Sequence, residues 1–308
     1  MRSLSPGKGR GKLIVFIFHR VLEKPDLLLA GEPDAATFDW MIRFISQAFT
    51  VLPFGTAVEQ LKRGDLPAAA ACITFDDGYR DNFAIALPIL QRHCVKATFF
   101  IATGFLDGGR MWNDDVIEAI RSAGNSRIDL SEFDLGSHEL STNTLRNQSL
   151  GAILGQLKYT PHEERATIAR QMAHRAGVLD RSNLMMSSDE VRGLRSAGME
   201  VGAHTRSHPI LSGLSDRQAK DEIEGGKSEL ETILDETVDV FAYPNGKPER
   251  DLTSRDMQLI ATAGFRAAAT TARGVATPQT NAFLIPRFTP WDRSYLRFGV
   301  RTASILAR

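Results

Sequence analysis

The stretch AACITFDDG, residues 70–78, decides the fold class of this chain. Its mostly apolar part, Ala70 to Phe75, predicts a buried strand, and Asp76-Asp77-Gly78 predicts that the strand ends in a tight turn. A second strand-like run, residues 199–203, ends in the same way at His204, and His208 follows four positions later. Two strands that both end in reactive side chains indicate a parallel α/β sheet with its site at the carboxyl ends.

Working outward, strand-like and helix-like segments alternate along much of the chain. Thr37 is the expected N-cap of the first helix. Strands are expected over residues 12–18, 70–75, 97–102, 199–203, 238–243, 265–271 and 283–286, and helices over 38–49, 82–93, 115–123, 163–176, 188–197, 215–234, 252–263 and at the C-terminal end. This alternation predicts a parallel sheet, either open or closed into a barrel.

The positions of the reactive residues favour the barrel. They lie at or just past the carboxyl ends of separate predicted strands, and they are His19, Asp76-Asp77, His204, Asn245 and Arg287. In a (β/α) barrel those ends gather at one face, whereas an open sheet would bring only two or three of them into its crevice. We therefore predict an α/β fold, a distorted, TIM-like (β/α) barrel of about seven strands.

The domain organisation is expected to be simple. Residues 1–11 are expected to form a flexible leader, and residues 12–308 a single barrel domain. Residues 104–186 contain helical patches but few strand signals, so they are interpreted as an inserted, mostly helical segment. The glycines show no phosphate-binding pattern at a strand–helix turn, which argues against a nucleotide cofactor.

Composition excludes several classes of protein. Lys+Arg and Asp+Glu balance at 37 each, so nothing favours a nucleic-acid partner. No stretch approaches the ~20 apolar residues of a membrane span, and the N-terminal apolar run is stopped by His19-Arg20 before it resembles a signal peptide. Two cysteines imply no disulfide framework. A cytoplasmic location is expected, and the oligomeric state is not indicated.

The residue types point to metal-assisted hydrolysis. One aspartate and two histidines form a three-ligand set for a catalytic divalent metal, with a coordination position left open. The second aspartate then remains free to act as a base. The alternative interpretation is a simple Asp-Asp-Gly turn and an unrelated pair of surface histidines. Zinc is the default metal, although nickel, cobalt, iron or manganese would also fit these ligands.

These two motifs resemble those of the polysaccharide deacetylase family (carbohydrate esterase family 4, the NodB-homology domain). The family's T-F-D-D-G corresponds to residues 74–78, and its H-[ST]-x-x-H to residues 204–208. The resemblance implies that Asp77, His204 and His208 bind the metal and that Asp76 is the general base. It covers most of the chain, with residues 104–186 the least certain part.

The family's third motif, R-x-P-Y-G, is altered to AYPNG at residues 242–246. Ala242 replaces the arginine that normally braces the base, and Asn245 replaces the tyrosine. The family uses the backbone N–H at the tyrosine position to hold the oxyanion, and a backbone donor survives side-chain replacement, so Asn245 is expected to serve. Arg287 is the candidate substitute for the missing arginine; the alternative is an arginine that only packs.

The family's last motif, L-x-H, supplies a general acid, yet no histidine follows His208. The predicted first strand ends in His19, and a barrel closes its first strand on its last. His19 would then occupy the place of the missing histidine, in a permuted order that resembles poly-N-acetylglucosamine deacetylases. The alternative is a histidine that belongs to the core.

The resemblance thus implies a metal-dependent hydrolase that removes N-acetyl or O-acetyl groups from a carbohydrate or glycan precursor. Two alternatives remain at this point. One is a deformylase or amidohydrolase that acts on another C–N bond in the same site. The other is a non-catalytic barrel that binds carbohydrate, although such a protein would not need Asp76.

Overall fold

A computed structural model describes residues 11–124, 126–178 and 184–307. They fall into two compact units. The barrel unit lies within residues 1–24, 31–107 and 185–308, and the helical unit within residues 25–30 and 108–184. All but Gly11 of the predicted leader, residues 1–11, lies outside the described residues. A single domain over residues 12–308 stays a prediction.

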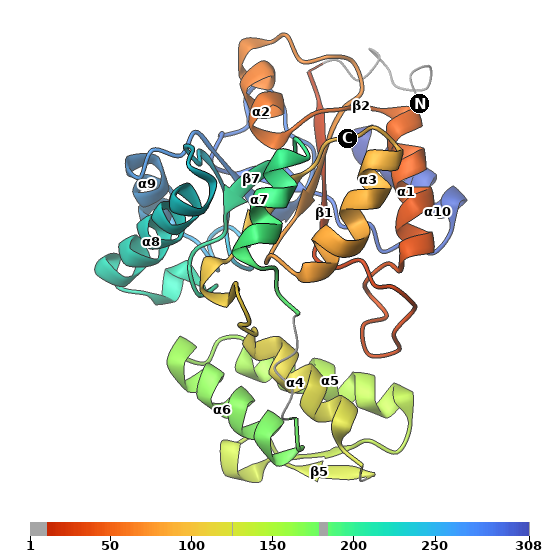
Figure 1. The fold of residues 1–308 in the computed structure, drawn as a ribbon, viewed down its shortest axis with the longest axis vertical. Helices are drawn as coiled ribbons and strands as arrows, with labels where there is room; N and C mark the ends of the chain where they lie inside the picture. Colours follow the sequence, from red (N-terminus) through yellow and green to blue (C-terminus); the bar gives the residue numbers. More distant parts are fainter. Residues whose placement is uncertain (1–10, 125, 179–183, 308) are drawn as a thin grey trace. The chain divides into compact units, whose positions relative to one another are not determined.

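The barrel unit is built on a parallel sheet (Figure 1). Its strands are β1 Leu13–Phe18, β2 Thr50–Val51, β3 Ala70–Phe75, β4 Thr98–Ile101, β7 Glu200–Ala203, β8 Val240–Ala242, β9 Ala267–Arg273 and β10 Ile285–Arg287. Seven of them follow the order β1-β3-β4-β7-β8-β9-β10, while β2 pairs with β3. Phe288, just past β10, bridges Phe16 of β1 in parallel, so the last strand returns to the first. The predicted seven-stranded (β/α) barrel is confirmed.

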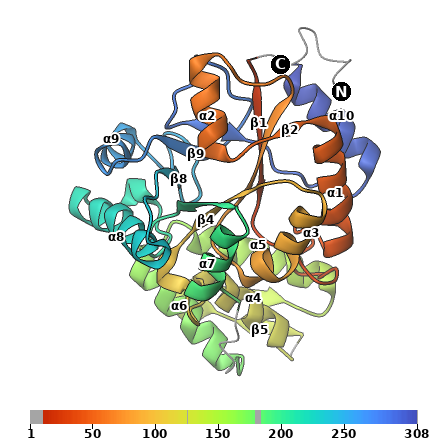
Figure 2. The same ribbon diagram turned by 45° about the horizontal axis from the view of Figure 1, so that its top comes forward.

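Helices flank this sheet, as the turned view also shows (Figure 2). They are α1 Ala35–Ala48, α2 Phe54–Arg63, α3 Leu87–Arg92, α7 Ser188–Ser196, α8 Asp216–Leu234, α9 Ser254–Thr262 and α10 Tyr295–Leu306, and a π-helical turn, Asn82–Ala86, leads into α3. The predicted N-cap of α1 was wrong. Asp34 caps the helix by accepting a hydrogen bond from Thr37 N at 2.8 Å, because the helix begins one turn earlier than its apolar stripe. Helix α2 was not predicted.

Successive residues of the strands pack into two different cores. Leu13 and Val15 of β1 belong to a cluster with small residues of β3, β8 and β9, whereas Ile14 and Phe16 belong to a second cluster with the helices. This alternation follows from the two-residue period of a strand and separates the barrel interior from the layer beneath the helices. The interior cluster combines small alanines of β3, β8 and β9 with larger side chains, including Phe54 of α2 and Phe100 of β4.

The helical unit has its own core. It contains α4 Trp112–Ser122, α5 Asn143–Leu157, α6 His162–Arg175 and a hairpin of β5 Arg127–Asp129 and β6 Ser137–Glu139. Apolar residues of all three helices, including Ile120, Ile153 and Met172, form one buried cluster. The hairpin and α5 were not predicted, because two three-residue strands and a helix without a clear apolar stripe leave little periodic signal.

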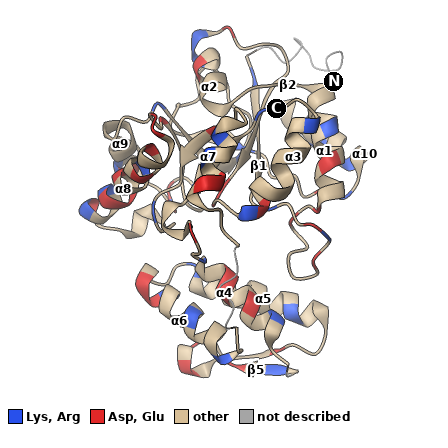
Figure 3. Cartoon of the chain, viewed as in Figure 1, with Lys and Arg blue, Asp and Glu red and all other residues tan. Residues whose placement is uncertain are grey.

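Charges of both signs are distributed over the surface, as α8 illustrates (Figure 3). None of the helices within the described residues combines the length and the apolar character that crossing a membrane requires.

Candidate active site

The two aspartates lie where β3 ends. Asp76 and Asp77 are almost fully buried, with 2% and 6% of their surface exposed. Asp76 N donates to Phe18 O at 3.0 Å and Ala102 N donates to Asp77 O at 3.2 Å, so neighbouring strands hold both residues. Asp77 has a φ of +78° and Gly78 one of +95°. This left-handed pair turns the chain sharply, and Asp and Gly are residue types that tolerate such a conformation.

The two histidines follow β7, the next strand but one in the sheet. His204 is buried, and its Nδ1 lies 2.7 Å from Ala242 O. Because a carbonyl only accepts, Nδ1 carries a proton, and Nε2 is the nitrogen that has a free lone pair whenever the ring is neutral. Nε2 of His204 and Nε2 of His208 each lie 3.4 Å from Asp77 Oδ1. Both histidines therefore converge on one carboxylate oxygen.

These three residues fit a divalent metal. One ligand atom from each of Asp77, His204 and His208 lies within 4.8 Å of the others. Asp77 Oδ1 is buried and accepts no hydrogen bond from the described residues. A buried carboxylate oxygen without a donor is costly unless a cation balances it. Two imidazoles and one carboxylate are a donor set that binds zinc and other first-row divalent metals.

Arg287 is aligned with the other aspartate. Its Nη1 and Nη2 each lie 2.7 Å from one oxygen of Asp76, in a bidentate pair, and its Nε donates to Thr270 O at 2.8 Å. The guanidinium is fully buried, and its carbon lies 5.9 Å from the centre of the Phe100 ring. The planar fork of arginine matches a carboxylate in this geometry, so the orientation of Asp76 is fixed.

The charges of the site determine which groups are ionised. Burial alone would raise the pKa of Asp76, but Arg287 and His204 outweigh it and hold that pKa below its ordinary value. Burial is likewise outweighed at Asp77, where the contact with His204 and the charge of His208 bring the pKa well below the usual range. Both carboxylates are therefore ionised at neutral pH.

His204 shifts in the opposite direction. Burial would lower its pKa, but Asp76 and Asp77 outweigh this effect and raise the pKa above the ordinary histidine value. Protons and metal ions thus compete for His204 Nε2 at neutral pH.

The two remaining predicted residues lie at the ends of β1 and β8. His19 is half-buried, and its carbonyl accepts from Asn82 Nδ2 at 2.9 Å. Burial raises the pKa of Asp77, and the charge of His19 is one of those that lower it, after the larger contributions of His204 and His208. Asn245 is half-buried with a φ of +59°, and its carbonyl accepts from the Thr271 hydroxyl.

Sequence reasoning missed one acidic neighbour of His19. Burial raises the pKa of Glu32, and His19 is the largest influence opposing that rise. Glu32 Oε2 also accepts from Arg20 N at 3.3 Å, which ties it to the residue after His19. Glu32 stands in a polar loop without periodicity, so no sequence pattern could have linked it to His19.

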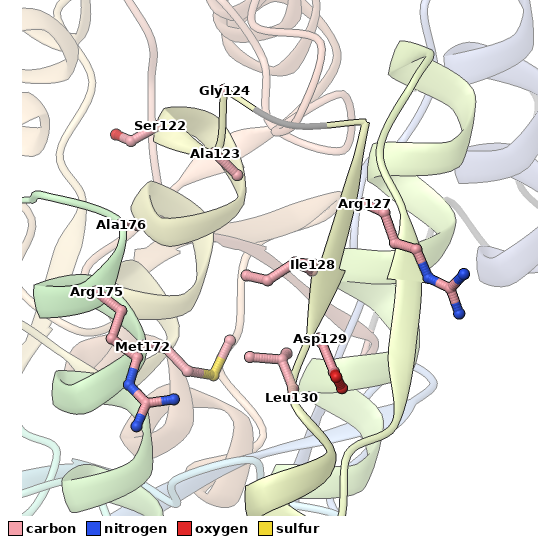
Figure 4. A pocket seen from close by; sticks show the side chains of 10 residues that line it. All are labelled: Ser122, Ala123, Gly124, Arg127, Ile128, Asp129, Leu130, Met172, Arg175 and Ala176. Atoms are coloured by element: carbon pink, nitrogen blue, oxygen red, sulfur yellow. The ribbon is translucent and has the colours of Figure 1, made fainter.

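A hollow of about 260 Å³ in the helical unit contains none of these residues (Figure 4). Ile128, Leu130 and Met172 turn toward one another inside it, while the Arg127 guanidinium extends away. Its polar groups do not form an acid–base or metal-ligand set, so the candidate site remains the carboxyl end of the barrel.

Comparison with known proteins identifies the family. A family model described as polysaccharide deacetylase matches residues 63–268, more than half of the chain and both Asp-Asp and His-His motifs. The chain belongs to the polysaccharide deacetylase family. Poly-β-1,6-N-acetyl-D-glucosamine N-deacetylase of Staphylococcus aureus strain N315 is 31% identical over 88 residues. That alignment covers 29% of this chain and spans only 30% of the relative's length.

Solved deacetylase structures share the fold. The Streptococcus pyogenes deacetylase PplD in complex with acetate has a TM-score of 0.65 at 17% identity, with 95% of this chain and 98% of that chain covered. IcaB from Ammonifex degensii has a TM-score of 0.63 at 18% identity, with 97% and 98% covered. At such identities the likeness establishes the barrel fold that this polysaccharide deacetylase family member shares with them.

Proposed function

We propose that the protein is a metal-dependent hydrolase that removes N-acetyl groups from an amino-sugar glycan. The observation that carries this proposal is the pair of adjacent, buried aspartates with different partners. Asp77 faces two histidines, whereas Asp76 is held by a bidentate arginine. One carboxylate is thus arranged as a ligand, and the other is arranged as an oriented base.

Asp77, His204 and His208 are the residues that would hold the metal. A divalent metal ion in such a site supplies Lewis-acid chemistry, which acidifies water and polarises an acyl oxygen. Ala242 O fixes the His204 ring through Nδ1 and directs Nε2 toward Asp77. Such outer contacts orient the ligands and tune their affinity.

Asp76 is the proposed general base. It would take a proton from the water that attacks the acetyl carbonyl, and a positioned base contributes about 10²–10⁴-fold to the rate. Arg287 bonds to both Asp76 oxygens, which fixes the orientation of the carboxylate, and it keeps the carboxylate ionised, so the group can accept a proton at neutral pH. We infer that Arg287 replaces the arginine that Ala242 lacks.

Asn245 and His19 complete the proposed chemistry. The Asn245 N–H would donate to the oxygen that becomes negatively charged when water adds to the carbonyl. His19 would then donate a proton to the amine nitrogen as the C–N bond breaks, leaving acetate and a free amino sugar.

The substrate class is supported by the family and by the staphylococcal relative, which is a poly-β-1,6-N-acetyl-D-glucosamine N-deacetylase. Acetate release from β-1,6-linked N-acetylglucosamine oligomers tests it directly. We expect release by the metal-loaded protein, loss after chelation and recovery on adding Zn²⁺. Binding of the oligomers without any release under metal-saturated conditions would reject the hydrolase and favour a carbohydrate-binding barrel.

The role of His19 has its own test. The His19→Ala variant should retain metal and lose about 10²–10⁴-fold in turnover, as expected for a general acid. Its metal content, measured alongside, separates this role from damage to the metal site. Unchanged turnover in the metal-saturated variant would show that His19 belongs only to the core.

A further inference from the structure

We propose that Glu222 of α8 is a positioning residue that holds the loop between the two ligand histidines in its metal-binding shape. This inference rests on the metal-binding role proposed for His204 and His208. The loop, residues 204–208, leaves β7 and turns back so that both rings reach Asp77 Oδ1.

The loop adopts an intrinsically unfavourable backbone. Thr205 has a φ of +62° and His208 a φ of +56°, both in the left-handed region. That region is a genuine outlier for a β-branched residue such as Thr205. Such conformations persist at functional sites only when surrounding contacts determine them. Thr205 contributes one local contact, because its hydroxyl accepts from His208 N at 3.1 Å.

Glu222 supplies the contacts to the middle of the loop. Its Oε2 accepts from Arg206 N at 3.0 Å and from Ser207 N at 2.8 Å, and its Oε1 accepts from the Ser207 hydroxyl. One carboxylate thus binds two consecutive backbone N–H groups and a side chain. These donors lie between the two ligand histidines, so the carboxylate fixes the separation of His204 from His208.

The neighbouring elements leave the loop little freedom. A Cβ on Gly226, one turn after Glu222 on α8, would lie 2.7 Å from the carbonyl carbon of Thr205, so only glycine permits this close approach. On another side, Gly104 N donates to Arg206 O at 2.8 Å. Glu229 of α8 accepts from Arg206 Nε at 2.7 Å and from the Thr103 hydroxyl. Helix α8 and the segment after β4 therefore hold the loop together.

The Glu222→Gln variant weakens this arrangement with little change in size. The amide loses the negative charge, so its single oxygen accepts more weakly from Arg206 N and Ser207 N, and its NH₂ group replaces the oxygen that accepts from the Ser207 hydroxyl. The loop would then have to be ordered by the metal itself, at the expense of affinity. Loss of an outer contact to metal ligands typically costs about 10- to 100-fold in metal affinity, and we expect a loss in that range for Zn²⁺.

The experiment measures Zn²⁺ affinity of the whole chain by competition with a chromophoric chelator, after metal removal, together with the thermal midpoint of the metal-free protein. Glu224→Gln is the matched control, since Glu224 lies on the same helix, is exposed and pairs with Lys220. If Glu222→Gln does not fold, Gly226→Ala replaces it as the test variant, because the added Cβ pushes α8 away from Thr205 and so disturbs the same loop.

We expect Glu222→Gln to bind Zn²⁺ 10- to 100-fold more weakly, with an unchanged metal-free midpoint, and Glu224→Gln to behave as wild type. Unchanged affinity in Glu222→Gln, an equal loss in Glu224→Gln, or a loss matched by a lower metal-free midpoint would overturn the inference. If the wild type binds Zn²⁺ and releases no acetate, the proposed function fails while the role of Glu222 stands.

Discussion

Two carboxylates at opposite ends of the barrel strands, the half-buried Glu200 and the buried Asp77, have opposite hydrogen-bonding situations. At the amino end of β7, both Glu200 oxygens lie 3.1–3.2 Å from Gly55 N, and Oε2 also accepts from Thr98 Oγ1 at 2.7 Å. At the carboxyl end of β3, Asp77 Oδ1 accepts no hydrogen bond from the described residues and faces two imidazoles.

The difference teaches how to tell a structural carboxylate from a functional one. Both Glu200 oxygens have hydrogen-bond donors within the chain, and these bonds tie the start of α2 to β4 and β7. Asp77 is more deeply buried than Glu200, yet its hydrogen bonding within the described residues is incomplete. An incomplete set of partners at a buried charge indicates that a ligand completes it.

The largest expected effect comes from Asp77. The Asp77→Asn variant should lose stoichiometric metal and, with it, all metal-dependent acetate release, because a neutral amide replaces the anionic ligand. Elemental analysis of the purified protein and the acetate assay measure both. Full metal occupancy in this variant would contradict the ligand set.

Arg287 gives the next largest effect. The Arg287→Ala variant leaves Asp76 buried without its cation and should lower the free energy of unfolding by about 3–5 kcal/mol. Urea denaturation measures the change. Arg266→Ala is the matched control at the other end of the barrel, since that partly exposed arginine should contribute only about 0–1 kcal/mol through its ion pairs. Equal losses of unfolding free energy in the two variants would show that the buried pair of Arg287 with Asp76 is no more important for stability than the exposed ion pairs of Arg266.

The pH dependence of metal binding follows from His204. Because its folded pKa is raised, Zn²⁺ affinity should rise by up to about tenfold per pH unit until the pH passes that pKa. The stability of the metal-free protein should change in the opposite direction, falling as the pH rises. The stabilisation from protonated His204 is complete below the ordinary pKa of about 6.5 and is lost as the pH rises through the raised value. Competition titrations and urea melts from pH 6 to 9 measure both trends. A flat affinity profile would refute this coupling.

The smallest effect on the site is expected at Glu200. The Glu200→Gln variant should cost about 1–3 kcal/mol of stability, through weaker hydrogen bonds, and leave Zn²⁺ affinity unchanged. Urea denaturation and the metal competition assay test the two parts separately. A change in metal affinity here would mean that the two ends of the barrel are coupled.

Much of the fold and of the candidate site could be predicted from the sequence, because the strand ends and their reactive residues are encoded by neighbouring positions. The apolar run of β3 ends at Asp76-Asp77, and its predicted bounds, residues 70–75, match the observed strand. The alternation of strands and helices predicted the parallel barrel. Helix α5 and the β5–β6 hairpin were missed because they are weakly periodic or short, whereas α2 was missed although Phe54, Ala57, Val58 and Leu61 follow a helical spacing.

The sequence by itself determined the fold class and the inventory of reactive groups. Only the tertiary structure decided their partners, because contacts between Asp76 and Arg287 or between Ser207 and Glu222 join distant positions that no local pattern encodes. The resemblance implied that Asp77 joins the two histidines and offered Arg287 for Asp76 beside the alternative of simple packing, and only the folded chain shows the bidentate pair that decides between these two. Closure of the barrel places these groups together, and burial gives their charges the strength to control one another.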